Sequence, residues 1–118
     1  MEWEVVELKG YAYFADRGYR IFVPLICGIG YDFIAAKGDE LIRVNVKLAG
    51  LKDKSNPSSW SITLASGAIS SGSKSDKVKC DVFLAYLPNK ERFIELPGTF
   101  FDTGNSRCRR IPKELLLS

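Results

Sequence analysis

The stretch YDFIAAKGDELIRVNVKLA, residues 31–49, decides the fold because it has the pattern of a β-hairpin. Two runs of strand-favouring residues, 31–36 and 41–49, flank the turn-forming segment Lys-Gly-Asp-Glu at 37–40. Successive strand residues point to opposite faces of a sheet, so the second run predicts a buried face and a polar face. The buried series is Ile42, Val44, Val46 and Leu48, and the polar series includes Arg43, Asn45 and Lys47.

The register of this hairpin decides which polar side chains meet. If residues 37–40 form the connection, Ala36 lies opposite Leu41 and Asp32 lies opposite Asn45. Directly opposed residues share a face, so Asp32, Asn45 and Lys47 would form one cluster. A two-residue loop keeps the three together, whereas a three-residue loop without a bulge would separate them. By itself the pattern is also typical of an ordinary solvated strand face.

A helix is predicted before the hairpin, over residues 3–17, and a strand over residues 19–24. Apolar residues recur in the helix at spacings of three and four, and Gly18 follows as a stop signal. We expect the buried stripe to consist of Val5, Leu8, Ala12 and Ala15, with Glu7, Tyr11 and Phe14 on a neighbouring stripe. A solvated glutamate is the ordinary interpretation of Glu7 in such a helix.

Further strands are predicted after the hairpin. Residues 50–58 read as a polar loop, 60–65 as a strand, and 66–79 as a mobile Ser/Gly/Lys-rich loop. Residues 81–87 and 92–96 form a second predicted hairpin around 88–91. Residues 97–107 read as irregular with a turn at 103–105, and a short helix is predicted at the end of the sequence. The order of elements predicts one α+β (α/β) domain over residues 1–118, with an N-terminal helix flanking a mixed sheet.

The composition excludes several kinds of chemistry. The sequence contains no histidine, which removes Ser-His-Asp and Cys-His catalysis and histidine metal centres. Chemistry must therefore depend on carboxylates, lysines, tyrosines or a bound metal. The three cysteines lack zinc-site or disulfide-framework spacing and fit a reducing cytoplasm. No apolar run is long enough to span a membrane, and the acidic start is not a signal peptide.

Positive charge is concentrated in the second part of the sequence. Residues 1–50 hold six Lys/Arg and seven Asp/Glu, a net charge of −1, whereas residues 51–118 hold eleven and seven, a net charge of +4. This imbalance permits a polyanionic partner, although basic loops are commonly just solvated. The candidate nucleic-acid contacts are Lys52, Lys54, Lys74, Lys77, Lys79, Arg107, Arg109 and Arg110.

The same segments resemble a known family. Glu7 on the predicted helix, Gly18-Tyr19 leading to Pro24, Tyr31-Asp32 and the Asn45-Val46-Lys47 strand follow the order of the PD-(D/E)XK nuclease superfamily. More narrowly, the sequence looks like small group I intron homing endonucleases of cyanobacterial type, with Holliday junction resolvases as more distant relatives. The resemblance covers residues 4–50, and residues 80–97 are similar to the hairpin that follows in such proteins.

The resemblance implies a restriction-endonuclease-like core and metal-dependent hydrolysis of phosphodiester bonds in double-stranded DNA at specific sites. Asp32 would bind Mg²⁺, or Mn²⁺ as a substitute, with the Val46 carbonyl as a second ligand and Glu7 completing the site. Lys47 would orient the attacking water and offset negative charge. Cutting both strands would imply a homo-oligomer. Its interface could use residues 114–118 or the pair Phe100 and Phe101, which could instead cap the core.

Asn45 departs from the family pattern, in which Glu, Asp or, among the homing enzymes, Gln occupies this position. An amide oxygen can bind a metal or a water, but it has no charge and cannot act as a base. Three interpretations stay open: a natural variant of the site, a catalytically weakened protein, or an engineered Asp→Asn substitution. The alternatives to an active homing endonuclease are a catalytically disabled DNA-binding protein on the same scaffold and a Holliday junction resolvase.

Overall fold

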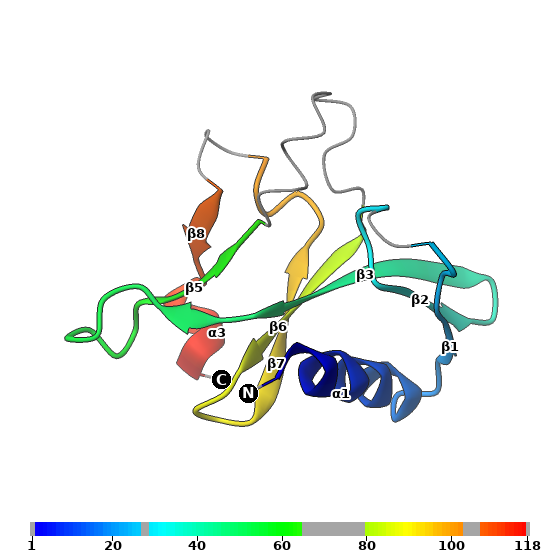
Figure 1. Ribbon diagram of the computed structural model, residues 1–118, viewed down its shortest axis with the longest axis horizontal. Coiled ribbons are helices and arrows are strands. Elements are labelled where there is room, and N and C mark those ends of the chain that lie inside the picture. The colour runs from blue at the N-terminus through cyan, green and yellow to red at the C-terminus, as the bar shows by residue number, and fades with distance from the viewer. Residues whose placement is uncertain (1, 27–28, 65–79, 103–106, 118) are drawn as a thin grey trace.

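A mixed five-stranded sheet with an N-terminal helix forms the main body of the protein. The computed structural model describes residues 2–26, 29–64, 80–102 and 107–117 (Figure 1). Helix α1 (Trp3–Ala15) precedes the strands, whose spatial order is β1-β2-β3-β6-β7. Their bounds are β1 Arg20–Phe22, β2 Phe33–Lys37, β3 Glu40–Leu48, β6 Val82–Leu87 and β7 Arg92–Pro97. Only β3 and β6 pair in parallel, so the predicted mixed sheet is confirmed.

The hairpin of β2 and β3 has the predicted register. Ala36 pairs with Leu41, and the connection narrows to a turn because Lys37 also pairs with Glu40. Gly38 adopts a φ of 59° at the first central position of this turn, which glycine tolerates without steric cost. The ladder ends where Phe33 pairs with Val44, so Asp32 lies one residue beyond its last pair.

Helix α1 exists as predicted, but its predicted buried stripe was wrong. Val5 and Leu8 are 42% and 62% exposed, whereas Val6, Gly10 and Phe14 are buried. The reason is close packing at Gly10, where a Cβ would lie only 3.0 Å from Cγ2 of Val46. A residue without a side chain lets the helix approach β3, and the helix is therefore rotated toward the stripe that contains Gly10.

A second, three-stranded sheet joins the end of β3 and was only partly predicted. Its strands are β4 (Gly50–Leu51), β5 (Trp60–Thr63) and β8 (Cys108–Arg110), in the order β4-β5-β8, with the short helix α3 (Lys113–Leu117) after them. Of these elements, β5 and α3 were predicted, whereas β4 lies in the segment expected to be a loop and β8 was not predicted. Both unpredicted strands pair with β5, a contact distant in sequence that a local pattern does not reveal. The loop predicted for 66–79 and the turn for 103–105 lie outside the described residues.

Two apolar clusters cover the two faces of the main sheet. Helix α1 covers one face of the sheet (Figure 1). On this face, Val44 and Val46 pack with Phe33, Val6 and Phe14. The other cluster contains side chains of the second sheet and α3, together with Phe83 of β6. In the predicted apolar series of β3, only Val44 and Val46 are fully buried; Ile42 is half-buried and Leu48 is 38% exposed near the end of the strand.

The aromatic pair Phe100 and Phe101 belongs to the second cluster. These residues are 4% and 8% exposed, so they cap the core rather than offer an interface. In α3, Leu116 is buried in the same cluster and Leu117 is exposed. Within the described ranges, no helix combines the length and the apolar character needed to cross a membrane.

An ion pair holds the parallel strands together beside the predicted cluster. The Arg43 guanidinium donates two hydrogen bonds of 3.1 Å to the carboxylate of Asp81, which also accepts one from the Arg43 backbone N–H at 2.8 Å. The Asp81 N–H in turn donates to the Arg43 carbonyl at 2.8 Å. These four bonds fix where β6 begins relative to β3, and therefore which residues lie beside Asn45 and Lys47.

Candidate functional site

Asp32 lies at the edge of β3, where β2 has not yet begun. Its backbone N–H donates to the Val44 carbonyl at 2.8 Å, and its Oδ2 accepts a hydrogen bond of 2.6 Å from the Val46 N–H. Burial raises the pKa of Asp32; the Val46 N–H opposes this rise, the Glu7 carboxylate adds to it, and Lys47 opposes it. The structure thus holds a carboxylate in a half-buried position that disfavours its negative charge.

The backbone of Val46 points toward the Asp32 carboxylate. In an antiparallel ladder, the N–H and C=O of one residue point to the same neighbouring strand. The Val46 N–H points toward Asp32, and β2 has no residue opposite Val46 because it begins opposite Val44. The Val46 carbonyl therefore lies on the edge of β3 that carries the Asp32 carboxylate.

Asn45 and Lys47 flank Val46 in β3 and are both half-buried. They share the face opposite the one that packs on α1. The Asn45 side chain donates from Nδ2 to the Gly30 carbonyl at 3.2 Å, and this bond does not use its amide oxygen. Burial lowers the pKa of Lys47, and the charge of Asp32 opposes this fall. Asp32 and Lys47 are thus close enough for each charge to affect the other.

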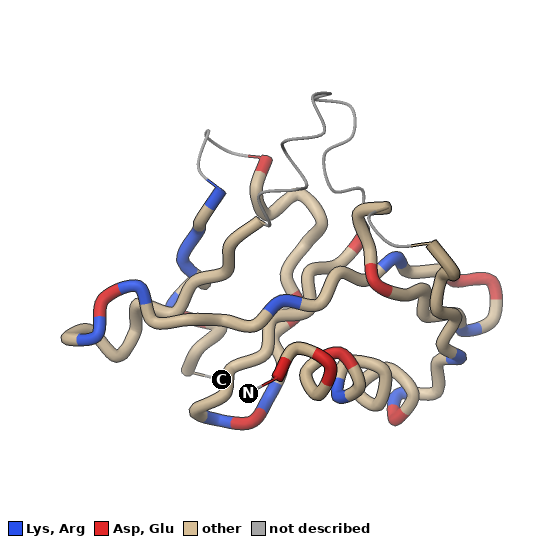
Figure 2. Tube along the Cα trace, in the orientation of Figure 1, with Lys and Arg blue, Asp and Glu red and all other residues tan. Residues whose placement is uncertain are grey.

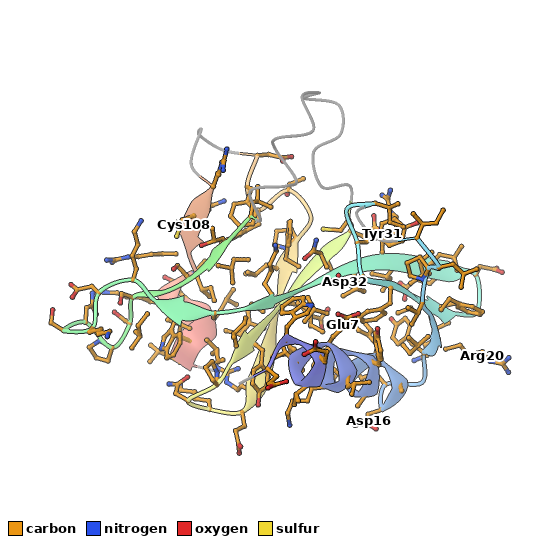
Figure 3. All side chains as sticks on the ribbon, viewed as in Figure 1. Glu7, Asp16, Arg20, Tyr31, Asp32 and Cys108 are labelled. Carbon is orange, nitrogen blue, oxygen red and sulfur yellow. The ribbon has the colours of Figure 1, made fainter. Side chains whose placement is uncertain are left out.

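Glu7 lies on α1, which packs on the face of the sheet opposite Asn45 and Lys47. It is half-buried in the second turn of α1, and its Oε1 accepts a hydrogen bond of 2.7 Å from the Tyr11 hydroxyl. Figure 3 shows Glu7 on α1 and, above it in this view, Asp32 in the segment just before β2. The Glu7 carboxylate adds to the rise that burial causes in the pKa of Asp32.

These atoms provide oxygen donors that suit a hard divalent cation. They are the carboxylates of Asp32 and Glu7, the Val46 carbonyl and the Asn45 amide oxygen. Among the described residues no three His, Cys, Asp or Glu side chains converge, as expected for a group with only two acids. A cation would also offset the charge of the half-buried Asp32, so the donor set fits such an ion.

The described candidate nucleic-acid contacts lie in β8, just before it, or in the segment between β4 and β5 (Figure 2). Lys52 and Lys54 are exposed in the segment between β4 and β5, and Arg110 is exposed at the end of β8. Arg109 is also exposed, but its guanidinium lies 4.6 Å from the Phe100 ring centre and donates to the Phe100 carbonyl. Arg107 is exposed just before β8. Lys74, Lys77 and Lys79 lie outside the described residues.

Two neighbours of the site were not given a role from the sequence. Tyr11 was placed on the stripe of Glu7, and its i, i+4 spacing was the signal that could have indicated the hydrogen bond. Cys80 is buried two residues before β6; burial raises its pKa to about 12, although the charges of Lys47 and Arg43 oppose this rise, so it is a protonated thiol at neutral pH. Its position depends on the parallel pairing of β3 and β6, which the sequence did not reveal.

Comparisons with known proteins agree with the overall fold. Residues 4–114 match the family model described as PD-(D/E)XK endonuclease. Among solved structures, the fold is similar to that of the bacterial homing endonuclease I-Ssp6803I, with a TM-score of 0.70 and 18% sequence identity. The match covers 92% of this chain and 70% of that one. No curated protein matches the sequence significantly.

Proposed function

The chain belongs to the PD-(D/E)XK endonuclease family, and from this premise we propose that it is a metal-dependent DNA endonuclease of the homing type. The observation that carries the proposal is the grouping of Glu7, Asp32 and Lys47 around the Val46 backbone. The fold similarity to a bacterial homing endonuclease supports the type. The family supports DNA as the substrate. We propose in addition that the cleavage occurs at specific sites.

The oxygen atoms around Asp32 are proposed to hold the cation. Asp32 and the Val46 carbonyl would be direct ligands, and Glu7 would complete the site from α1. Mg²⁺, with Mn²⁺ as a substitute, would polarise the scissile phosphate and lower the pKa of an attacking water. Asp32 supplies the negative charge that attracts the cation, and its bond to the Val46 N–H fixes the orientation of the carboxylate.

Lys47 and Asn45 are proposed to act on the water and the phosphate. The Lys47 amine would hydrogen-bond the attacking water and offset negative charge that develops on the phosphate. The Asn45 amide group is tied to Gly30 through its nitrogen, which leaves its oxygen able to accept a hydrogen bond from that water. Because an amide cannot remove a proton, Asn45 would position the water without acting as its base.

The basic residues of the second sheet are proposed to bind the DNA backbone. Lys52, Lys54, Arg107 and Arg110 are exposed and carry the positive charge that phosphate contacts require. The same role is proposed for Lys74, Lys77 and Lys79. The guanidinium of Arg109 already contacts Phe100, so we assign it to hold β8 in place.

Cleavage of both strands would require more than one copy of this chain, since each copy carries one such site. We propose a homo-oligomer that buries the apolar residues at and after β1. Phe22, Val23 and Ile26 are more than half exposed, and Leu25 is fully exposed. Light scattering coupled to gel filtration tests this proposal: Leu25→Asp should lower the molar mass relative to the unchanged protein, and a monomeric unchanged protein would refute it.

The proposed activity can be tested on plasmids that carry fragments of the source genome, with Mg²⁺ or Mn²⁺. We expect cleavage at discrete positions that disappears with EDTA, in Asp32→Ala and in Lys47→Ala. Asp39→Ala and Lys113→Ala are matched controls, since both residues are exposed and lie outside the proposed site. Absence of cleavage at high protein concentration, with either ion, would refute an active endonuclease. A strong preference for four-way junctions over linear duplex would identify a resolvase instead.

A catalytically disabled DNA-binding protein is the second candidate function, and the observation that favours it is the uncharged Asn45. The variants Asn45→Gln and Asn45→Glu separate the two candidates. Recovery of cleavage in either variant would show a nuclease weakened at this position. DNA binding that is insensitive to EDTA, without cleavage in either variant, would show a binding protein.

A further inference from the structure

Tyr11 contacts one acidic residue of the proposed metal site, Glu7, and Phe33, the neighbour of the other. Its hydroxyl donates to Glu7 Oε1 at 2.7 Å, across one turn of α1. Its ring packs edge-on against Phe33, with ring centres 5.0 Å apart and an angle of 89° between the rings. Phe33 directly follows Asp32 in the chain. One side chain therefore contacts the acid on α1 and the residue next to the acid before β2.

The packing of Tyr11 limits where its hydroxyl can lie. The ring is half-buried against the cluster between α1 and the sheet. Phe33 is also held by Phe14, at a ring distance of 5.9 Å, so Tyr11 contacts a fixed partner. A ring with only two rotatable side-chain bonds, packed in this way, places its hydroxyl in a narrow range of positions.

Glu7 needs such a partner because the second carboxylate repels it. Two like charges close together favour conformations that move them apart, and a glutamate side chain has the freedom to turn toward solvent. The bond from Tyr11 opposes that rotation and engages one carboxylate oxygen, which leaves Oε2 to face the cation.

We propose that Tyr11 is a positioning residue for the metal site: it holds Glu7 beside Asp32 through the hydroxyl–carboxylate bond, without touching the cation itself. This inference rests on the proposed function, because it takes Glu7 and Asp32 to be the groups that hold the cation. A group that orients a metal ligand commonly changes metal affinity by about 10–100-fold.

The test is Mn²⁺ binding to the full chain, measured by electron paramagnetic resonance of the free ion. Tyr11→Phe keeps the ring that packs on Phe33 and removes only the hydroxyl. We expect it to weaken Mn²⁺ binding by about 10-fold or more, and to raise the Mg²⁺ concentration that gives half-maximal cleavage by the same factor. The circular dichroism spectrum should stay unchanged.

Tyr13→Phe is a matched control on the same helix. The Tyr13 hydroxyl also donates to a glutamate, Glu95 on β7, at 2.5 Å, and this bond does not involve Glu7 or Asp32. Its loss should leave Mn²⁺ affinity unchanged. A merely structural role of Tyr11 would lower the melting temperature without changing the affinity for Mn²⁺, and that result would overturn the inference.

A double-mutant cycle tests whether Tyr11 acts through Glu7. In a Glu7→Ala background, Tyr11→Phe should cause no further loss of Mn²⁺ affinity. If the loss persists there, Tyr11 does not position Glu7 and the inference is wrong, although the proposed function stands. If the unchanged protein binds no divalent ion, the proposed function is wrong and the inference fails with it.

Discussion

The carboxylate of Asp32 is bound to the backbone of Val46, with 2.6 Å between Oδ2 and the amide nitrogen. This bond lies at the edge of β3 where the ladder to β2 has ended, so the side chain takes the place of a strand partner. The residue therefore has a structural role in addition to its proposed role as a metal ligand. Its burial raises its pKa, which means that the ionised form is unfavourable in the folded protein without a cation.

Asp32→Asn should stabilise the metal-free protein while it abolishes cleavage. An acid whose pKa is raised on folding binds its proton more tightly in the folded state, so stability falls as the pH rises from its ordinary pKa of 3.8 through the folded value. Asparagine stays neutral and keeps an oxygen to accept the Val46 N–H. At pH 7.5 without metal we expect Tm to rise by a few degrees, on the order expected for a modest free-energy change in a small domain.

Calorimetry between pH 4 and pH 8 measures this effect. The gain in Tm should shrink as the pH approaches 4, because the unchanged protein then becomes protonated at Asp32. Adding Mg²⁺ should stabilise the unchanged protein and not the variant. Asp39→Asn, in the exposed turn between β2 and β3, serves as the control and should show no gain. A variant no more stable than the unchanged protein at pH 7.5 would contradict the role given to burial.

Tyr86→Phe should raise the free energy of unfolding. Tyr86 is 2% exposed, and its hydroxyl makes no hydrogen bond to the described residues. A buried hydroxyl without a partner costs about 1–3 kcal/mol, so its removal should add about 1 kcal/mol to the stability measured by urea unfolding. The ring keeps its packing on Phe93, at a ring distance of 4.9 Å. Tyr13→Phe removes a hydroxyl that has a hydrogen-bond partner, so it should lower the free energy of unfolding. An equal loss of stability in both variants would show that the Tyr86 hydroxyl also has a hydrogen-bond partner.

The hairpin was predictable because its information is local. Alternation from 41 to 48 and the turn at 37–40 predicted the two strands, the register stayed conditional on the length of the loop, and the pairing of Ala36 with Leu41 agrees with a connection at 37–40. The grouping of Asp32 with Lys47 follows from the same register. Glu7 was selected only by its place in the family pattern, since a helical glutamate has no sequence signal that distinguishes a ligand from a solvated residue.

The errors concern contacts between elements distant in sequence. Glycine is a weak helix residue, yet the missing side chain of Gly10 is what lets α1 lie against Val46. Strand β8 contains two arginines in three residues and has no strand pattern of its own; its pairing with β5 makes it a strand. The parallel pairing of β3 with β6 likewise has no local sequence signal, and neither has the position of Cys80 relative to β3 that depends on it.

Gly10→Ala should destabilise the protein, although alanine favours a helix by about 1 kcal/mol over glycine. The added methyl group would lie 3.0 Å from Cγ2 of Val46, and Val46 is fully buried, so it has little room to move. We expect a net loss of about 1–2 kcal/mol in the free energy of unfolding, within the range for overpacked cores. The shift of α1 should also move Glu7 and weaken Mn²⁺ binding.

A second substitution checks the cause of that loss. Val46→Ala removes the methyl group that the new side chain would meet, so the combination with Gly10→Ala should be more stable than the sum of the two single losses predicts. Strict additivity in urea unfolding would mean that the contact with Val46 is not the reason. Ala12→Gly, at an exposed position of α1, supplies the helix-propensity reference, with an expected loss of about 1 kcal/mol.

Arg109 and Arg110 should respond differently to alanine substitution, although they are neighbours in β8. Arg110 is exposed, and its loss should make the salt dependence of DNA binding less steep by about one unit of slope, with little change in Tm. Arg109 lies over the Phe100 ring, so its loss should lower Tm through a contact of about 0.5–1 kcal/mol and leave the slope unchanged. Fluorescence anisotropy at several salt concentrations, with Lys113→Ala as the charge control, measures the slope. Equal slopes for the Arg110 and Lys113 variants would show that Arg110 does not contact the DNA backbone. A changed slope for Arg109→Ala would show that Arg109 does contact it.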